Sequence, residues 1–271
     1  MMEKLLSSVV AARKPANKLR GFLASQATIV FSILIFFSLP AAALFQAEYY
    51  QFPRSMEYDY VTYRKGSKEL LFKEKFNISK QRYARQDYVV IRSSSQPTDN
   101  NPDKFSKETL TYYQIDQGKI STSHHENHTK KSGQTQTLFK IDFDWPRRTA
   151  NYGTAVRVND RTVLTHDLGV FFQNMLLKDL NDVPFTVLFQ NGNSLNLRAR
   201  CVGEEEVAAK AGKFTCKKFE MAPDFQLISM IAPKIYFWFE AKPPYRYVRY
   251  EGPERGPFSP TVVQELVGYK L

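Results

Sequence analysis

The chain has 271 residues and carries 38 Lys and Arg against 27 Asp and Glu, which gives a formal net charge of +11. Five of the basic residues and one acid precede residue 44, so the rest of the chain holds 33 basic and 26 acidic residues. A net charge of this size on about 228 residues is an ordinary feature of a soluble surface. The charge alone therefore does not indicate a nucleic-acid-binding protein.

The first 43 residues are typical of a secretory signal peptide. Basic residues come first, and the apolar run "ATIVFSILIFFSL", Pro40 and the small residues Ala41 and Ala43 follow. This is the order that the translocon and signal peptidase recognise. We expect cleavage after Ala43 and a periplasmic protein, which argues against nucleic acid as a partner. The alternative is an uncleaved inner-membrane anchor, because the apolar run approaches the length of about 20 residues that spans a bilayer.

Residues 44–271 are expected to form a single β-rich envelope domain, because no Pro-rich or Ser-rich linker divides them. Period-two patterns predict about eleven strands. In chain order they are "MEYDYVTYR", "ELLFKEKFNI", "YARQDYVVIR", "ETLTYYQID", "QTLFKIDFDW", "VPFTVLFQ", "SLNLRARCV", "KFTCKKFEM", "KIYFWFEA", "YRYVRYEG" and "VVQELVGYK". The polar stretch near residues 93–108 is rich in turn formers and predicts a loop or insertion.

A single helix is predicted after the signal peptide, at residues 166–180, with Thr165 or Asp167 near its start. Its apolar stripe comprises Leu168, Phe172, Met175 and Leu176. An antiparallel sheet with one apolar helix either places the helix across its concave face or closes into a barrel with the helix in one mouth. We therefore expect a mainly β protein with a curved sheet or unclosed barrel.

The two cysteines, Cys201 and Cys216, flank a predicted hairpin in which Val207 faces Phe214. A disulfide is plausible in an oxidising compartment and would close a loop of about sixteen residues. However, this register places Cys201 opposite Glu220, so the two cysteines are several residues apart along the hairpin. A bulge at Gly203 would be needed to help bring them together. The sequence agrees equally well with two reduced, buried thiols.

The polar motifs do not define a catalytic or metal centre. "HHENH", with His124, His125 and His128, is predicted to be a solvated strand end rather than a metal site, because no suitable carboxylate pattern accompanies it. Asp142 and Asp144 lie two apart and would share one strand face, as in a glycosidase acid and base pair, but such pairs are common on polar sheet surfaces. No nucleophile elbow, phosphate loop or dinucleotide fingerprint is present. We expect no cofactor.

The order of these pieces resembles the domain of unknown function 3108 family of Gram-negative envelope proteins. The matching segments are "IDFDW", "LTHDLGVFFQNMLL", "VPFTVLFQNGNSLNLRARCVGEEEV", "AGKFTCKKFEM", "IYFWFEAKPPYRYVRYEG" and "VVQELVGYK". The resemblance implies a half-barrel similar to the LolA and LolB lipoprotein carriers, with an apolar interior. It implies no catalytic residues.

The preferred hypothesis is a non-enzymatic periplasmic protein that binds an apolar ligand, such as a lipid, an acyl chain or a lipoprotein segment. The candidate ligand-binding residues lie on the helix and on three strands: Phe172, Met175, Val183, Phe185, Val187, Leu195, Leu197 and Phe237. One alternative is an envelope assembly or interaction protein in which these side chains form an ordinary core. A second is a glycan-acting enzyme that uses Asp142 and Asp144. The basic excess is also compatible with peripheral contact with an anionic membrane surface.

Overall fold

A computed structural model describes residues 47–48, 55–67, 69–101, 105–117, 119–131, 134–225, 232–254 and 259–271. The predicted signal segment, residues 1–43, lies outside the described residues. Within the described part of the chain, no helix is both long enough and apolar enough to cross a bilayer.

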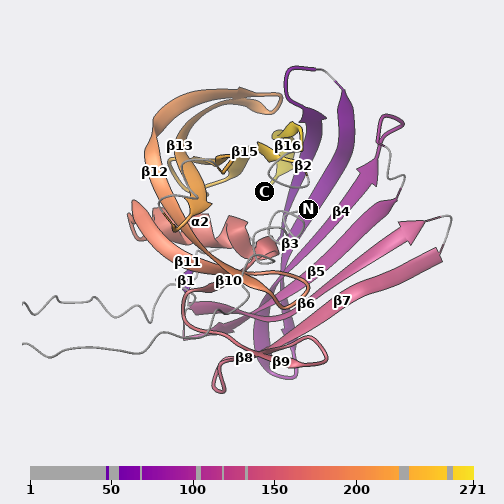
Figure 1. The fold of residues 1–271 in the computed structure, drawn as a ribbon, viewed down its shortest axis with the longest axis vertical. Helices are drawn as coiled ribbons and strands as arrows, with labels where there is room; N and C mark the ends of the chain where they lie inside the picture. Colours follow the sequence, from indigo (N-terminus) through magenta and orange to yellow (C-terminus); the bar gives the residue numbers. More distant parts are fainter. Residues whose placement is uncertain are drawn as a thin grey trace, which may run out of the picture.

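In the described part of the chain, one large curved sheet wraps around one α-helix (Figure 1). Its strands are β1 (Ala47–Glu48), β2 (Ser55–Arg64), β3 (Leu70–Tyr83), β4 (Gln86–Pro97), β5 (Ser106–Asp116), β6 (Lys119–Lys131), β7 (Gln134–Asp144), β8 (Thr149–Asn151), β9 (Ala155–Arg157), β10 (Thr162–Leu164), β11 (Asp182–Leu188), β12 (Ser194–Ala209), β13 (Gly212–Pro223), β14 (Ile235–Glu240), β15 (Tyr247–Pro253) and β16 (Thr261–Lys270). A short 3₁₀ turn, Thr165–Asp167, leads into α2 (Leu168–Leu177).

The strands follow the order β10-β11-β12-β13-β14-β15-β16-β2-β3-β4-β5-β6-β7-β8-β9, with β1 paired to β6. All neighbouring pairs are antiparallel except β10 and β11. The pairing of β16 with β2 joins the C-terminal half of the sheet to the N-terminal half. The two outermost strands, β9 and β10, are not hydrogen-bonded neighbours in this order. The prediction of a mainly β protein with a curved, unclosed sheet is therefore confirmed.

Side chains, rather than a ladder of hydrogen bonds, hold the two edges of the sheet together. Ile141 of β7 and Ala150 of β8 pack in one buried cluster with Leu164 of β10 and Leu188 of β11. The phenol of Tyr152 also donates a hydrogen bond of 3.0 Å to the carbonyl oxygen of residue 189, beyond β11. Apolar packing of this kind removes water from the seam and protects both edges without closing the barrel.

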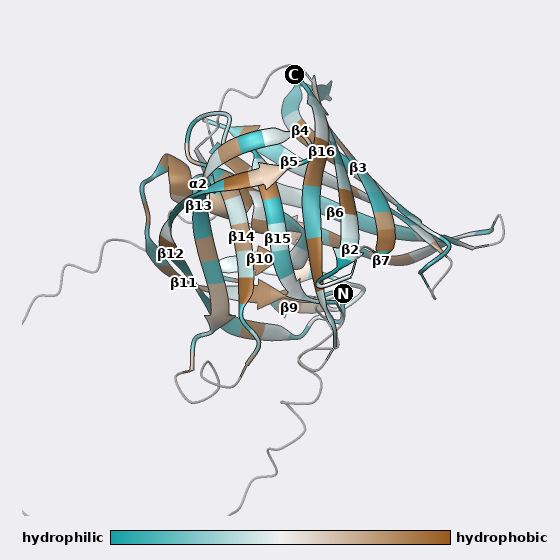
Figure 2. Ribbon diagram, turned by 90° about the horizontal axis from the view of Figure 1, so that it is seen from above, coloured by the Kyte–Doolittle hydropathy of each residue, from teal (hydrophilic) through white to brown (hydrophobic). Residues whose placement is uncertain are grey.

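Alternating hydropathy along the strands accounts for the two faces of the sheet (Figure 2). On β14, Ile235, Phe237 and Phe239 are buried and point toward α2, as period-two geometry requires. On β2, Tyr58 and Tyr60 are buried, whereas Glu57, the residue before Tyr58, forms an ion pair with Lys75 on the outer face. On these two strands the inner face is thus largely apolar.

The loop predicted near residues 93–108 is shorter than expected, and one strand was missed. Residues 93–97 complete β4 and residues 106–108 begin β5, and the described part of the connection has a turn at residues 99–100. The polar segment Lys119–Lys131, which was not predicted as a strand, forms β6 and pairs along its length with β5 and β7. The backbone N–H and C=O groups of β6 are hydrogen-bonded to strands on both sides, whichever side chains the strand carries. This explains how a polar sequence forms a strand inside the sheet.

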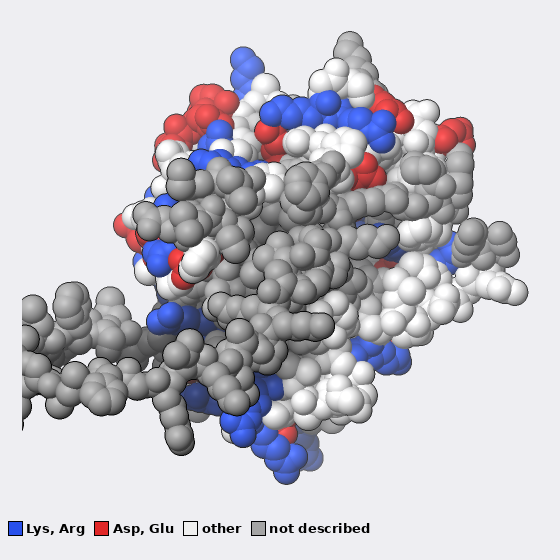
Figure 3. Space-filling view, viewed as in Figure 1, with Lys and Arg blue, Asp and Glu red and all other residues white. Residues whose placement is uncertain are grey.

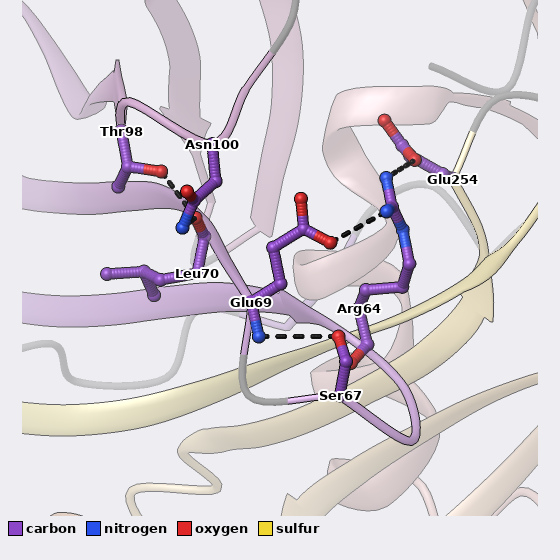
Figure 4. Close-up of polar contacts among 7 residues, drawn as sticks. All are labelled: Arg64, Ser67, Glu69, Leu70, Thr98, Asn100 and Glu254. Atoms are coloured by element: carbon purple, nitrogen blue, oxygen red, sulfur yellow. Dashed lines mark hydrogen bonds and ion pairs between the residues drawn. The ribbon is translucent and has the colours of Figure 1, made fainter.

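A network of polar contacts fixes the turn from β2 to β3 at one rim of the sheet (Figure 4). The guanidinium of Arg64 lies 2.7 Å from the Glu69 carboxylate and 3.9 Å from the largely buried carboxylate of Glu254. The hydroxyl of Thr98 donates to the Leu70 carbonyl oxygen, so the turn after β4 is tied to the start of β3. These contacts stabilise the rim next to the inner face of β2 and β3.

Candidate functional site

The structure brings together all the residues predicted to bind an apolar ligand. The helix residues Phe172 and Met175 meet the inner faces of β11, β12 and β14. Seven of the eight belong to one buried cluster and the last packs against its edge: Phe172, Met175, Val183, Phe185, Val187, Leu197 and Phe237, with Leu195 at the margin. The facing assignments made from the sequence are therefore confirmed.

The side chains of this cluster fill one another's space. Phe172 has no exposed surface, and its ring centroid lies 4.6 Å from that of Phe237, 5.1 Å from that of Phe219 and 5.6 Å from that of Phe239. Met175 has no exposed surface either. Aromatic centroids at 4.5 to 7 Å are the spacing of a packed protein interior. Contact between these residues and a ligand stays a prediction.

A second part of the inner face is apolar but less completely buried. On β3 and β4, Phe76, Ile78 and Ile91 are only partly buried, although they point to the same side as the buried Tyr58 and Tyr60. Tyr247 of β15 is partly buried as well and stacks obliquely on Tyr60, with ring centroids 5.2 Å apart. Apolar side chains that face inward and still contact solvent leave surface that a ligand can cover.

One carboxylate, that of Glu74, lies on this aromatic part of the inner face. Glu74 is half-buried on β3, directly opposite Tyr60 of β2. The hydroxyl of Thr62 donates a 2.8 Å hydrogen bond to Oε2, and the Gln264 amide donates to the same oxygen. Desolvation raises the pKa of Glu74, although these two hydrogen bonds and the more distant positive charge of Lys107 oppose the rise. The side chain is thus oriented by polar neighbours but placed where charge is costly.

A buried polar cluster around Asp167 was missed by the sequence analysis. Asp167 precedes α2, but its carboxylate makes no capping bond to the helix. Instead it accepts hydrogen bonds of 2.7 Å from the Tyr113 phenol and 2.7 Å from the Thr122 hydroxyl, on β5 and β6. Burial raises the pKa of Asp167 to about 6. These two hydrogen bonds tie the start of the helix to the sheet.

Two histidines adjoin this cluster and stack on each other, with ring centroids 4.4 Å apart. His125 is fully buried, and its Nδ1 lies 2.7 Å from the Thr111 hydroxyl. Burial lowers the pKa of His125 to about 2. His166 is exposed beside Gln190, and desolvation lowers its pKa as well. Both rings are therefore neutral at pH 7.

The other candidate catalytic and metal residues lie on the outer face. Asp142 and Asp144 share one face of β7, as predicted, but Asp142 lies 2.6 Å from His124 and Asp144 pairs with Arg147. His124 and His128 flank Glu126 at 3.7 and 3.4 Å. Within the described residues, no group of three or more His, Cys, Asp and Glu side chains has an arrangement that could hold a metal ion.

The cysteines are free thiols, so a disulfide between Cys201 and Cys216 is the wrong alternative. The predicted bulge is present between Cys201 and Gly203, and it places Cys201 opposite Phe219 instead of Glu220. Cys216 lies opposite Glu205 and three residues from Phe219 along β13, about 10 Å along the strand. Disulfides require Cα atoms within about 7 Å. The bulge therefore shifts the register in the needed direction but not far enough.

Alkylation of the native protein should accordingly label one cysteine. Cys201 is partly exposed, whereas Cys216 is buried and burial raises its thiol pKa to about 12. We expect one label by mass spectrometry of the folded protein at pH 8 and two after unfolding without a reductant. A Cys216→Ser variant should still take one label in the folded state. Unfolded protein that takes no label until a reductant is added would contradict the two free thiols.

Basic side chains gather near the end of the sheet where β8 and β9 lie, at the lower edge of Figure 3. Arg147 and Arg148 are largely exposed there, with side-chain exposures of 83% and 64%, and each has one acidic partner. Exposed pairs of this kind contribute little to stability. Contact of this end with an anionic membrane surface stays a prediction.

Sequence comparison gives no relative: neither a protein-family model nor a curated protein matches the chain. The resemblance to the domain of unknown function 3108 family therefore also stays a prediction. Among solved structures, a β-barrel-like protein of domain of unknown function 1849 from Brucella abortus is similar with a TM-score of 0.49 and 8% identity. The similarity covers 80% of this chain and 97% of that one.

A second similar structure, described as an exported protein with a YmcC-like fold, comes from Bacteroides fragilis. Its TM-score is 0.40 at 13% identity, over 83% of this chain and 100% of that chain. At these levels the likenesses give no information on ligand or activity.

Proposed function

We propose that this protein is a non-enzymatic envelope protein that binds an amphipathic ligand on the inner face of its curved sheet. The observation that carries the proposal is the set of inward-facing apolar side chains on β3 and β4 that keep partial exposure, in particular Phe76, Ile78 and Ile91. The cluster beneath α2 serves as the packed support of the site. The ligand lies next to this cluster, on β2 to β4.

Energetics favour an acyl chain at this place. Each methylene removed from water contributes about 0.8 kcal/mol, so a chain of moderate length offsets the cost of association. The proposed location is the periplasm, with residues 1–43 as the export signal. A half-barrel carrier of this type agrees with the resemblance to the domain of unknown function 3108 family and to LolA and LolB.

Titration with a dansylated fatty acid tests the proposal directly. We expect saturable binding at micromolar concentration, with an increase in dansyl fluorescence as the probe leaves water. Ile91→Asp should weaken binding at least about ten-fold, because the bound chain would desolvate the new carboxylate. The matched control is Arg92→Asp, which introduces the same side chain on the exposed outer face of the same strand.

Native mass spectrometry of protein released from its own envelope without detergent provides the second readout. A bound species with the mass of a lipid or an acyl compound supports the proposal. A single ligand-free mass together with no saturable probe binding would reject it. That result would favour the alternative of an assembly protein, which the dense packing beneath α2 also supports.

A further inference from the structure

The inner face beside the proposed acyl site carries a carboxylate that no described cation contacts directly. Among the described residues, no Lys, Arg or His nitrogen lies within 4.0 Å of the Glu74 carboxylate. The hydrogen bonds from Thr62 and Gln264 both reach Oε2, and no described residue donates to Oε1. Glu74 is only partly buried, and Oε1 is not among the buried polar atoms without a partner, so this oxygen stays accessible to a ligand. A partly desolvated carboxylate gains free energy when a cation contacts it.

The lateral neighbours of Glu74 orient it further. The Tyr247 phenol donates a 2.7 Å hydrogen bond to the Gln264 carbonyl oxygen, which leaves the Gln264 amide to donate to Glu74. The Tyr60 phenol donates a 2.9 Å hydrogen bond to the backbone carbonyl oxygen of Tyr247. Both phenols are thereby directed to fixed acceptors on β15 and β16. Glu74 is held in place by a chain of hydrogen bonds across four strands.

Aromatic residues neighbour Glu74 on the inner face. The Tyr60 ring meets the Phe76 ring edge-on at 5.3 Å and the Tyr247 ring at 5.2 Å. Tyr60 is opposite Glu74 across the ladder, and Phe76 is two residues along the same face of β3. Rings of this kind present negatively charged faces that attract cations, and quaternary ammonium groups are recognised by such cages. The carboxylate and the rings therefore favour the same sign of ligand charge.

Other ionisable groups on the inner face do not neutralise Glu74 by direct pairing. Lys107 of β5 lies on the same face as Glu74 but two strands away, because Ser95 of β4 is paired with both residues. The Lys107 Nζ lies 5.1 Å from the centroid of the Phe105 ring. Two strand spacings correspond to about 10 Å. Arg246, next to Tyr247, is already paired with Glu240 at 2.8 Å. Asp167 is hydrogen-bonded to Tyr113 and Thr122.

We propose that Glu74, together with Tyr60, Phe76 and Tyr247, binds the cationic group of an amphipathic ligand, an alkylammonium or a trimethylammonium group. This inference rests on the proposed function, since the apolar chain of the same ligand would lie on the adjacent inner face at Ile78 and Ile91. The bound cation supplies Glu74 with its missing counter-ion. The rings of Phe76 and Tyr247 line one side of the bound cation, and we call these two rings the aromatic wall.

Two probes with the same chain and opposite charge separate the cation site from the acyl site. We expect the full chain to bind dodecyltrimethylammonium at least about ten-fold more tightly than laurate, measured by calorimetry below the micelle concentration of both. Glu74→Gln should remove this preference and leave laurate binding unchanged or improved. Glu57→Gln, the same change on the outer face of β2, should keep the preference.

A second variant tests the aromatic wall independently. Phe76→Leu keeps an apolar side chain on the inner face but removes the ring, so it should reduce the preference for the ammonium probe without abolishing binding of laurate. Unchanged circular dichroism and melting temperature identify the variants that fold normally. Equal affinity of the wild type for both probes, or a preference that survives in Glu74→Gln, would overturn the cation site alone. Absence of binding by either probe would instead reject the acyl site and the cation site together.

Discussion

Replacing Phe172 by alanine is expected to lower the free energy of unfolding by about 3 to 5 kcal/mol, the range for a buried aromatic side chain whose cavity does not collapse. Phe172 is fully buried and lies against the rings of Phe171, Phe219, Phe237 and Phe239. Collapse is limited here because the neighbouring rings belong to separate hydrogen-bonded strands and cannot all move inward. The lost transfer free energy of the side chain and the free-energy cost of the residual cavity therefore add.

Urea unfolding followed by tryptophan fluorescence measures this effect. The midpoint should fall while the slope with denaturant stays the same, because the surface exposed on unfolding is nearly unchanged. Phe225→Ala is the matched control: Phe225 is 59% exposed, so we expect a change within about 0.5 kcal/mol. A loss below about 1 kcal/mol in Phe172→Ala would show that the helix does not support the sheet at this position.

The faces of β11, β12 and β14 could be predicted from the sequence because one side of each strand meets the helix. Wherever a strand has one buried face, a period of two determines which residues point inward, and a shift of one residue would expose all of them. This is why Val183, Phe185, Leu197 and Phe237 were assigned correctly from pattern alone. The same reasoning placed Asp142 and Asp144 on one face, but it could not say that this face is the outer one.

Strand β6 shows where pattern reasoning fails. Its inward residues Thr122, His125 and Asn127 are polar, so the strand shows no apolar alternation although all three are buried. Irregular pairing between Asn127 and His128 interrupts the period as well. The only available signal was the distance between the β-rich segments on either side, which leaves room for an additional strand in an antiparallel sheet.

Asp167 and Glu74 illustrate a second limit. An acidic residue just before an apolar helical stripe is usually a helix cap, and a single Glu in an alternating strand usually faces solvent. Which partner a carboxylate meets depends on strands far away in sequence: Tyr113 for Asp167, and Gln264 for Glu74. Contacts of this separation follow only from the completed sheet.

Replacing Asp167 by asparagine is expected to change the pH dependence of stability in a defined direction. Burial raises the pKa of Asp167 to about 6, from an ordinary value of 3.8 in the unfolded chain. Between these two values the folded protein binds a proton that the unfolded chain has released, so the contribution of Asp167 to stability is fully present below about pH 4 and is lost as the pH rises to 6. A shift of this size corresponds to about 3 kcal/mol.

The nearby histidines act in the opposite direction, and the variant must be compared with the wild type at each pH for this reason. Desolvation lowers the pKa of His125 to about 2 and also lowers that of His166, so their contributions to stability increase as the pH rises toward their unfolded value of about 6.5. Both histidines are present in Asp167→Asn. The difference in unfolding free energy between variant and wild type therefore isolates Asp167.

We expect this difference to shift in favour of Asp167→Asn by about 2 to 3 kcal/mol between pH 4 and pH 7, measured by urea unfolding at one-unit intervals. The asparagine amide can still accept a hydrogen bond from Tyr113 or Thr122, so the variant should keep the fold while removing the charge. Asp179→Asn is the control, because the Asp179 side chain is 82% exposed and should give parallel curves. Parallel curves for Asp167→Asn itself would mean that the carboxylate is solvated in the folded protein and that its hydrogen bonds to β5 and β6 do not exclude water.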